Sequence, residues 1–289
     1  MDTEAVKTQM GGGLTLDARA LSDEFKSRAR EQWTDNPCGT HVAQDLEFGS
    51  REYFDRIEEF RYQFSPWLKD VAQFSSYAGK RLIEVGCGAG TDLLQFARGG
   101  AIVTGIDLTP RSIEIARKRF EVYGLPGQFL IGDAENLSFP DHSFDAAYSF
   151  GVLHHTPNTQ KAIGEIYRIL RPGGRATVML YHKTSIYFWG SIILKRGLLR
   201  GALAKLTPGD IMSQYVEYSD TGRRPLVKAY TSAEVREMFR QFERIEVTVR
   251  QLERHDLKAA GRLLPESTFR WLEHNFGWNL IVSATKGAR

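Results

Sequence analysis

The sequence predicts an α/β protein in which helices cover both faces of a parallel sheet. From about residue 80 onward, short apolar runs alternate with amphipathic helical stretches, as expected for strands joined by helical crossovers. A glycine-rich loop, EVGCGAG at 84–90, separates the first apolar run from the first helix of this series. The 289 residues, of which 42% are hydrophobic and 25% charged, are enough for one large globular domain with additions.

The expected strands are short runs rich in apolar residues, at 81–85, 101–106, 128–131, 144–150 and 176–181. Helices are expected between them at 92–98, from Pro110 to Gly124, and at 158–170. Thr109 suits the N-cap of the second helix, Pro110 its first turn and Gly124 its end. The turn Arg171–Gly174 is expected to close the third helix. A helix at 231–241, a strand at 245–250 and the run 278–284 would complete the sheet.

The rhythm changes on either side of this core, which suggests additions to it. The two helices expected before the core lie around 16–33 and 51–64 and are joined by the turn-rich loop DNPCGTH. We divide the chain into a disordered segment at 1–14, an N-terminal helical lid at 15–79, a core at 80–182, an inserted cap at 183–230 and a completion of the core sheet at 231–289.

Composition narrows the class of protein. A net charge of only +3 does not indicate strong binding to nucleic acid. Two cysteines, Cys38 and Cys87, do not suggest a disulfide framework and favour a reducing compartment. The N-terminus has no apolar signal segment, and the longest apolar stretch, 186–194, is too short to span a bilayer. These features predict a cytoplasmic protein.

The glycine loop has three interpretations: it could bind a dinucleotide, bind another nucleotide-like cofactor, or allow close packing of helix on strand. Its spacing is G-x-G-x-G (Gly86, Gly88, Gly90) rather than the dinucleotide pattern G-x-G-x-x-G. Glu84 lies two residues before the first glycine, and Asp107 ends the next strand, where a carboxylate can hold two ribose hydroxyls. Because backbone amides at a helix N-terminus favour anions, the loop also suits a carboxylate or phosphate.

The third strand adds a further acidic residue. Asp133 follows that strand directly, where its side chain could accept a hydrogen bond from an adenine amino group. Ligands of open α/β sheets bind at the carboxyl edge of the strands, so Glu84, Asp107 and Asp133 are expected to meet in one crevice.

Five motifs in this order, EVGCGAG, GIDLTP, GDAENLSFPDHSFD, SFGVLHH and LRPGG, make the sequence resemble the class I S-adenosylmethionine-dependent methyltransferases. The resemblance is to the ubiquinone/menaquinone-biosynthesis-like branch, which acts on small molecules. It covers about residues 78–182 and the last strand, WNLIVSATK. It implies a Rossmann-like, seven-stranded, mostly parallel sheet with an antiparallel last strand, and S-adenosyl-L-methionine as cofactor.

The resemblance also implies roles for individual residues. Gly86, Cys87 and Gly88, behind Glu84, would approach the methionine part of the cofactor, and Asp107 would hold the ribose with Leu108 beside the adenine. Asp133 would bind the adenine amino group, next to the backbone of Ala134 and Glu135. The remaining residues expected at the cofactor or substrate are Phe150, His155 and, from the lid, Arg61 or Tyr62. The lid aromatics, Trp33 among them, could close the pocket or only pack the helices.

Methyl transfer is an in-line displacement, so the protein mainly aligns the reactants and excludes water. An acceptor that carries a proton also needs a base. Candidates are His154, His155, Tyr181 and His182 near strand ends, with a structural role equally open for the histidine pair. We favour His154 and Tyr181. Of the two histidines only one is expected to face the substrate, because adjacent residues cannot both point the same way. No metal is expected, because the spacing of the cysteines and histidines matches no zinc pattern.

The segment 185–206, SIYFWGSIILKRGLLRGALAKL, is apolar and basic. We favour a lid or packing helix over an interfacial helix that touches a membrane. Cations downstream, including Arg223, Arg224 and Lys228, could meet an anionic substrate or form a solvated surface. Whether the protein is a monomer or a homodimer stays open.

The expected activity is methyl transfer to a small organic acceptor. The alternative is another use of S-adenosylmethionine, such as cyclisation or lysis, because binding a cofactor does not fix the chemistry. An RNA or protein methyltransferase is less favoured. The segment after the fourth strand has neither the N/D-P-P-Y/F motif of base methylases nor a pair of glutamates for guanidinium, and no RNA-binding module follows.

Overall fold

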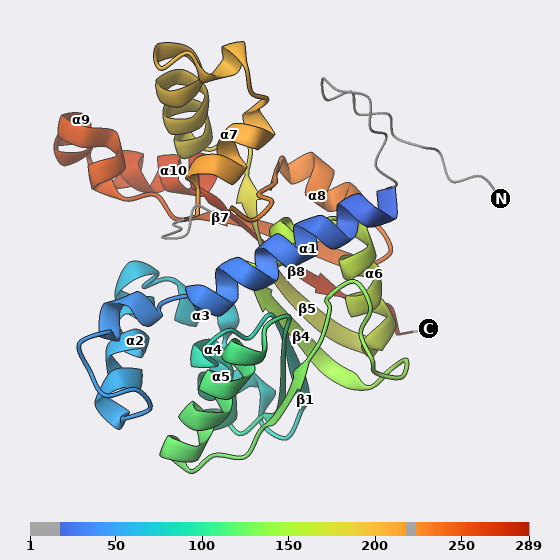
Figure 1. Ribbon diagram of the computed structural model, residues 1–289. Helices are drawn as coiled ribbons and strands as arrows, with labels where there is room; N and C mark the ends of the chain where they lie inside the picture. Colours follow the sequence, from blue (N-terminus) through green and yellow to red (C-terminus); the bar gives the residue numbers. More distant parts are fainter. Residues whose placement is uncertain (1–17, 218–223, 289) are drawn as a thin grey trace.

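The computed structural model describes residues 18–217 and 224–288 of the chain (Figure 1). The disordered segment expected at 1–14 lies outside these residues, as do Tyr218 and Arg223. Among the described residues, no helix is long and apolar enough to cross a membrane.

A single sheet forms the centre of the molecule, with strand order β3-β2-β1-β4-β5-β8-β7. The parallel strands are β1 (Arg81–Val85), β2 (Ile102–Asp107), β3 (Gln128–Ile131), β4 (Phe144–Phe150) and β5 (Leu170–His182). The strand β8 (Asn279–Thr285) runs antiparallel to β5 and to β7 (Arg244–Arg250). The mostly parallel sheet with an antiparallel last strand is therefore confirmed. A two-residue strand, β6 (Ala229–Tyr230), pairs with β5 outside the main path and brings the sheet to eight strands.

Helices cover both faces of the sheet. α4 (Thr91–Arg98) and α5 (Pro110–Tyr123) pack on one face, and α6 (Thr159–Ile169) and α8 (Ser232–Met238) pack on the other. As expected, Thr109 caps α5 by accepting a hydrogen bond from the Ser112 amide, and Gly124 ends it with a positive φ of 65°. Adjacent residues of β1 point to opposite faces: Leu82 joins the core under α4 and α5, and Ile83 joins the core under α6.

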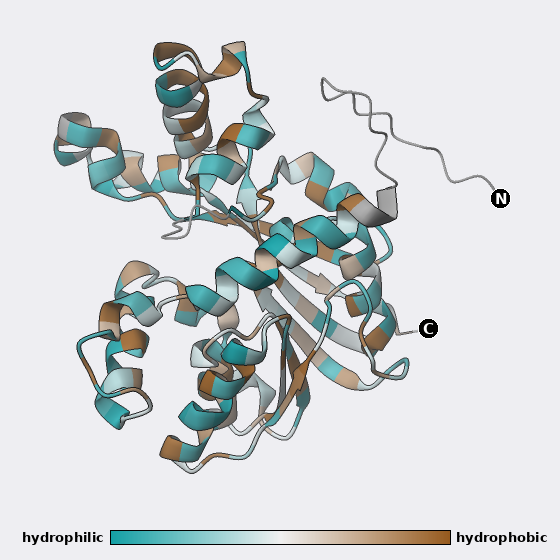
Figure 2. Cartoon of the chain, viewed as in Figure 1, coloured by the Kyte–Doolittle hydropathy of each residue, from teal (hydrophilic) through white to brown (hydrophobic). Residues whose placement is uncertain are grey.

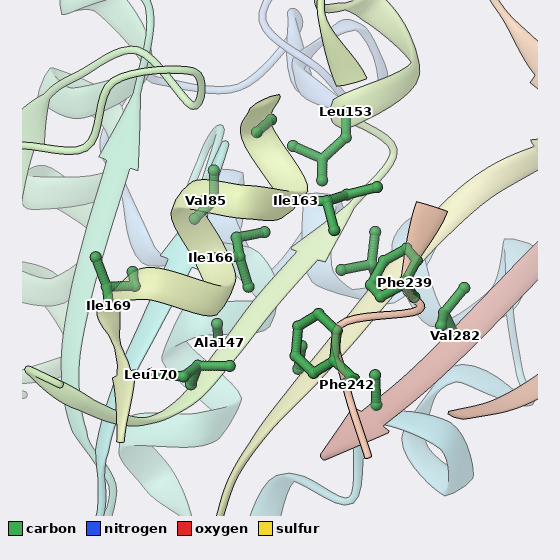
Figure 3. Close-up of a cluster of buried hydrophobic side chains, with 14 of the residues drawn as sticks. Val85, Ala147, Leu153, Ile163, Ile166, Ile169, Leu170, Phe239, Phe242 and Val282 are labelled. Carbon is green, nitrogen blue, oxygen red and sulfur yellow. The ribbon is translucent and has the colours of Figure 1, made fainter. Parts of the chain in front are cut away.

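The core under α6 is the larger of the two, and Figure 3 shows its centre. Ile163, Ile166 and Ile169 recur at helical spacing along α6, and all three are fully buried. They pack toward Val85 and Ala147 of the sheet, while Phe239, Phe242 and Val282 extend the cluster toward α8 and β8. Burying one such isoleucine contributes about 1.5–3 kcal/mol, so this face anchors β1 and β4, from which the functional loops leave.

The core strand β5 begins earlier than expected. Leu170 pairs with Phe144, but the next registered pair joins Arg175 to Ala146, so the intervening residues bulge out of the ladder. The expectation of a separate turn at Arg171–Gly174 was wrong. Pro172 fits there because it lies outside the register with β4, and the glycine pair bonds to Lys286 after β8: the Gly173 amide donates to the Lys286 carbonyl, and the Gly174 carbonyl accepts from the Lys286 amide, both at 2.9 Å.

The segments before and between the core elements are helical. α1 (Ala18–Asp35), η1 (Thr40–Ala43), α2 (Arg51–Phe64), α3 (Leu68–Ala72) and η2 (Phe74–Tyr77) precede β1. The cap consists of a π-helix, η4 (Phe188–Leu199), with η5 (Ala202–Ala204) and α7 (Pro208–Tyr215). A short turn, η3 (Leu153–His155), follows β4. Between β7 and β8 the chain forms η6 (Arg254–Leu257), α9 (Lys258–Leu263) and α10 (Glu266–Phe276), for which the sequence analysis proposed no helices.

Candidate functional site

A cavity of about 620 Å³ lies at the carboxyl ends of β1, β2 and β4. The strand order reverses between β1 and β4, and open α/β sheets bind their ligands at such a switch point. The volume is in the range of small-molecule sites. Four parts of the chain supply its walls: the core loops, the helices before β1, the cap, and the segment between β7 and β8.

The glycine loop after β1 forms the floor of the cavity. Gly86 has a φ of +79°, and a Cβ on it would lie 2.3 Å from Cγ2 of Val152, so only glycine fits there. The Gly86 and Cys87 amides donate to the Ile106 carbonyl at 2.8 and 2.9 Å, which ties the loop to β2. Gly88 adds no side chain, and a Cβ there would meet open space. The loop thus offers bare backbone to a ligand.

Asp107, at the end of β2, faces the same cavity and is held in a fixed orientation. Its Oδ2 accepts from the Gly88 amide at 3.0 Å, and its Oδ1 accepts from the Thr109 amide and hydroxyl, both at 2.9 Å. Burial raises the pKa of Asp107, and these hydrogen bonds oppose that rise. The carboxylate is therefore preorganised with acceptor capacity left for a ligand.

Glu84 is buried in the wall of the cavity, and its Oε2 has no hydrogen-bond partner among the described residues. Burial, and then the negative charge of Asp92, raises the pKa of Glu84 well above its usual value. An unpartnered buried carboxylate oxygen is costly, and a cationic donor in the cavity would relieve that cost.

A buried ion pair joins the lid to the core. Arg61 of α2 donates to Asp92 of α4 through Nε at 3.2 Å and Nη2 at 2.6 Å. The hydroxyls of Tyr62 and Tyr148 donate to the same carboxylate at 3.1 and 2.9 Å. Arg61 lines the cavity, and its guanidinium lies 4.5 Å from the ring centre of Phe150. Since a guanidinium has five donors, Arg61 can hold Asp92 and still reach a ligand.

Asp133 follows β3 as expected and lines the cavity together with Leu108 and Ala134. Lys26 of α1 bridges two carboxylates at this end, contacting Asp133 Oδ2 at 2.8 Å and Glu135 Oε2 at 2.9 Å. The Glu135 side chain is buried outside the cavity wall, where it also accepts from the Asn158 amide at 2.7 Å. Helix α1 is thereby fixed across the β3 end of the cavity.

A polar group lies at the other end. The His155 ring lines the cavity, and its Nδ1 is 2.8 Å from the Leu226 carbonyl oxygen. Because a carbonyl only accepts, Nδ1 carries the proton and Nε2 keeps a lone pair in the neutral ring. Nε2 lies 3.6 Å from Oε1 of Glu217, which also accepts a hydrogen bond from the Tyr181 hydroxyl at 2.8 Å. Tyr181 and Glu217 both line the cavity.

His154 does not project into the cavity, contrary to our expectation. The ring is fully buried, stacks on Tyr181 with 3.8 Å between ring centroids, and has no hydrogen-bond partner for either nitrogen among the described residues. Burial lowers the pKa of His154 well below its usual value, so the ring is neutral. The two histidines lie in the turn η3, where strand alternation does not tell which one faces the cavity.

Several residues at the cavity escaped the sequence analysis. Asp92 was taken only as part of a helix, although an acid in the first turn after a glycine loop is a signal that could have been used. Glu217 and Lys26 gave no local signal, because long-range packing brings them to the site. The Cys38 thiol also lines the cavity and is exposed to solvent.

His154, His155 and Glu217 each offer one atom suited to a metal, and these atoms lie within 4.8 Å of one another. The predicted absence of a metal site rested on the spacing of residues in the sequence, which does not address this grouping.

Comparison with known proteins identifies the core. Residues 83–178 match the methyltransferase domain family. This segment is a class I methyltransferase domain. The match begins in β1 and ends in β5, so the methyltransferase domain contains the glycine loop, Asp107, Asp133 and the histidine pair. The lid, the cap and the segment between β7 and β8 lie outside it.

Curated relatives are similar to about a third of the chain. The chain is 41% identical over 99 residues to a phthiotriol/phenolphthiotriol dimycocerosates methyltransferase of Mycobacterium leprae, over 34% of this chain and 36% of the relative. A fatty-acid O-methyltransferase of Mycolicibacterium smegmatis is 39% identical over 116 residues, or 39% and 41% of the two chains. A demethylmenaquinone methyltransferase of Thermus thermophilus is 41% identical over 104 residues, or 35% and 47%. The chain thus spans less than half the length of these relatives.

Solved structures share the fold over more of the chain. A SAM-dependent methyltransferase from Methanosarcina mazei superimposes with a TM-score of 0.54 at 23% identity, over 73% of this chain and 93% of that one. The [4+2]-cyclase SpnF superimposes with a TM-score of 0.51 at 20% identity, over 94% and 97%. At these identities the likeness concerns the fold alone.

Proposed function

We propose that the protein transfers the methyl group of S-adenosylmethionine to a small, largely apolar organic acceptor. The observation that carries the proposal is the cavity itself, which the methyltransferase motifs line together with the lid, the cap and the segment between β7 and β8. When bound, the cofactor supplies an activated methyl group on a sulfonium, so the chain needs to bind, orient and keep out water.

The chemistry of the walls fits this cofactor, which carries a sulfonium and an ammonium. The wall of the cavity contains more acidic side chains than basic ones. Its lysine and arginine are Lys26 and Arg61, and its acidic residues are Glu84, Asp92, Asp107, Asp133, Glu217, Glu253 and Asp256. In this proposal the unpartnered Glu84 Oε2 attracts the ammonium, and the spare donors of Arg61 hold the carboxylate of the methionine part. The glycine loop, with Cys87, leaves room for the methionine part of the cofactor to lie close to the backbone.

The nucleoside part would lie toward β2 and β3. Asp107 accepts from the ribose hydroxyls, Leu108 flanks the adenine, and Asp133 accepts from its amino group, beside Ala134. The backbone next to Glu135 lies at this end, but its side chain supports the site indirectly, by holding Lys26 of α1. Phe150 packs against Arg61, so it would keep that guanidinium aligned.

The acceptor end is lined with aromatic and aliphatic side chains, which favours an apolar acceptor; they include Trp33, Phe60, Phe64, Tyr187, Leu252, Phe276 and Trp278. The names of the three relatives give dimycocerosates, a fatty acid and demethylmenaquinone as what those proteins methylate. We therefore propose a lipid-like acceptor for this chain.

We propose His155 rather than His154 as the base for an acceptor that carries a proton. Its Nδ1–H is fixed by the Leu226 carbonyl, which leaves Nε2 able to take the proton. Glu217 lies 3.6 Å from Nε2 and would stabilise the resulting imidazolium, while Tyr181 orients Glu217 through its hydroxyl. His154 packs against Tyr181 and would hold the group in place.

The proposal is tested with S-adenosylmethionine labelled in the methyl group and a lipid extract fractionated by polarity. We expect label in an apolar fraction, a product one methylene heavier than its precursor, and S-adenosylhomocysteine in equal amount. Conversion of S-adenosylmethionine without any labelled acceptor would instead favour cyclisation or lysis. Failure to bind S-adenosylhomocysteine in calorimetry would refute the proposal.

The neighbouring histidines provide a matched pair of variants for the base. His155→Gln should lower kcat by about 10²–10⁴ with little change in cofactor affinity, as expected for loss of a general base. His154→Phe keeps an aromatic ring in an unpartnered buried position and should leave kcat within a few fold. If His154→Phe abolished turnover and His155→Gln did not, the assignment would be reversed.

A further inference from the structure

The outer face of the cap exposes four large apolar side chains on one helix, η4. The exposed fractions are 57% for Trp189, 51% for Leu194, 61% for Leu198 and 76% for Leu199. Trp189, Leu194 and Leu198 are spaced by five and four residues, about one turn each in a helix whose hydrogen bonds span five residues. They therefore share one side of η4, which stands away from the sheet at the top of Figure 1.

The opposite side of η4 holds the helix on the cap. Phe188 and Ile192 are buried and pack with Ile211 and Met212 of α7 and with Val227. Since this cluster already anchors the helix, its exposed side is not needed to hold the cap together. Single exposed leucines are ordinary, but a tryptophan and three leucines on one helix indicate a contact surface.

The charges along the segment 188–206 are of one sign. Every charged residue between 188 and 206 is basic, although the whole chain has 35 acidic residues against 38 basic ones. Arg196 stacks on Tyr215 at 4.3 Å, whereas Lys195, Arg200 and Lys205 are exposed. Figure 2 shows hydrophobic and hydrophilic residues side by side along η4. An apolar side rich in tryptophan and leucine, bordered by lysine and arginine, is the pattern of a helix that lies in a membrane interface.

We propose that this face of the cap docks on an anionic lipid bilayer. Trp189 and the three leucines would enter the headgroup region, and Lys195, Arg200 and Lys205 would meet lipid phosphates. Docking would bring the cap wall of the cavity near the bilayer, because Tyr187, just before η4, lines the cavity. The inference rests on the surface of the cap and not on the methyl-transfer proposal.

The test is cosedimentation of the full chain with phosphatidylcholine vesicles, with and without phosphatidylglycerol. We expect binding to the anionic vesicles that is at least tenfold tighter than to phosphatidylcholine alone and that weakens with salt, because the cations of this segment attract anionic headgroups and salt screens that attraction. Lys195→Glu/Arg200→Glu and, separately, Leu198→Glu/Leu199→Glu should each weaken binding at least tenfold. No methyl donor is present, so the result is independent of the proposed activity.

The control matched to Leu198→Glu/Leu199→Glu is Ile102→Glu/Ile131→Glu, which adds the same two negative charges at apolar side chains of β2 and β3 that are 61% and 60% exposed. This control should bind like the unmodified protein. The proposal is overturned if the unmodified protein ignores anionic vesicles, or if the control loses as much binding as the cap variants. It is also overturned if light scattering shows a dimer that Leu198→Glu/Leu199→Glu dissociates, because a second copy would then cover the face.

Discussion

Replacing Asp107 by alanine should weaken binding of S-adenosylhomocysteine about tenfold to a hundredfold. The carboxylate has roughly four acceptor sites. Three are taken by the Gly88 amide and by the amide and hydroxyl of Thr109, which leaves about one for the ribose. One hydrogen bond to a charged group contributes about 1.5–3 kcal/mol, and tenfold in affinity corresponds to about 1.4 kcal/mol.

Isothermal titration calorimetry measures this loss directly, and a second variant separates ribose binding from loop order. Thr109→Val removes one hydrogen bond to Asp107 and the N-cap of α5 but keeps the carboxylate. It should cost about 1 kcal/mol of unfolding free energy and only a few fold in affinity. Replacing Asp107 should lower the affinity for 2′-deoxy-S-adenosylhomocysteine less than it lowers the affinity for S-adenosylhomocysteine.

The reasoning fails if Asp107→Ala binds as tightly as the unmodified protein, or if Thr109→Val loses as much affinity as Asp107→Ala. The first result would remove the ribose contact, and the second would assign the effect to the loop. Measuring the affinity over a series of pH values tests the direction of the pKa shift of Asp107. Burial raises the pKa of Asp107, so acidification should weaken binding at a higher pH than an exposed aspartate would allow.

Two further predictions concern buried charges. Arg61→Met leaves the buried Asp92 without its cation and should destabilise the protein by about 3–5 kcal/mol in urea unfolding. Arg61→Met/Asp92→Leu should recover only part of this loss, because the Tyr62 and Tyr148 hydroxyls then lose their acceptor, and equal damage in both variants would contradict the pairing. Burial lowers the pKa of Lys228 from 10.5 to about 8, so the unfolded chain holds more protons between these values and stability should rise with pH across that window. The full cost below pH 8 is roughly 3 kcal/mol. Lys228→Met loses only the hydrogen bond to the Pro157 carbonyl, so it should be more stable than the unmodified protein at neutral pH and lose this advantage by about pH 10; an advantage independent of pH would refute the assignment.

The fold was readable from the sequence where local patterns determine it. β1, β3 and β4 have the bounds expected from their short apolar runs, and α5 has the expected cap, first turn and end. Strand β5 was misjudged because Arg171–Gly174 has the composition of a turn, whereas pairing of Leu170 with Phe144 keeps it in the strand. Local composition does not report a contact made across the sheet.

The sequence predicted site residues only where a polar side chain lies at or near the end of an expected strand. Glu84, Asp107 and Asp133 were expected in one crevice, and all three line the cavity. Asp92 was missed because its partner Arg61 lies on another helix, before β1, and Glu217 was missed because the cap brings it to His155. His154 was preferred over His155 because adjacent side chains point in different directions. That rule does not tell which of the two side chains faces the cavity, least of all in a turn.

Residues inside and outside the methyltransferase domain line different parts of the cavity. The methyltransferase domain at 83–178 supplies the glycine loop and Asp107, so the match covers the end proposed for the cofactor. Trp33, Tyr187 and Trp278 face the other end and lie outside it. If this division holds, enlarging the acceptor end by Trp278→Ala should change which acceptor is methylated and leave the affinity for S-adenosylhomocysteine within a few fold. The residues that select the acceptor are therefore to be sought in the lid, the cap and the segment between β7 and β8, which lie outside the methyltransferase domain.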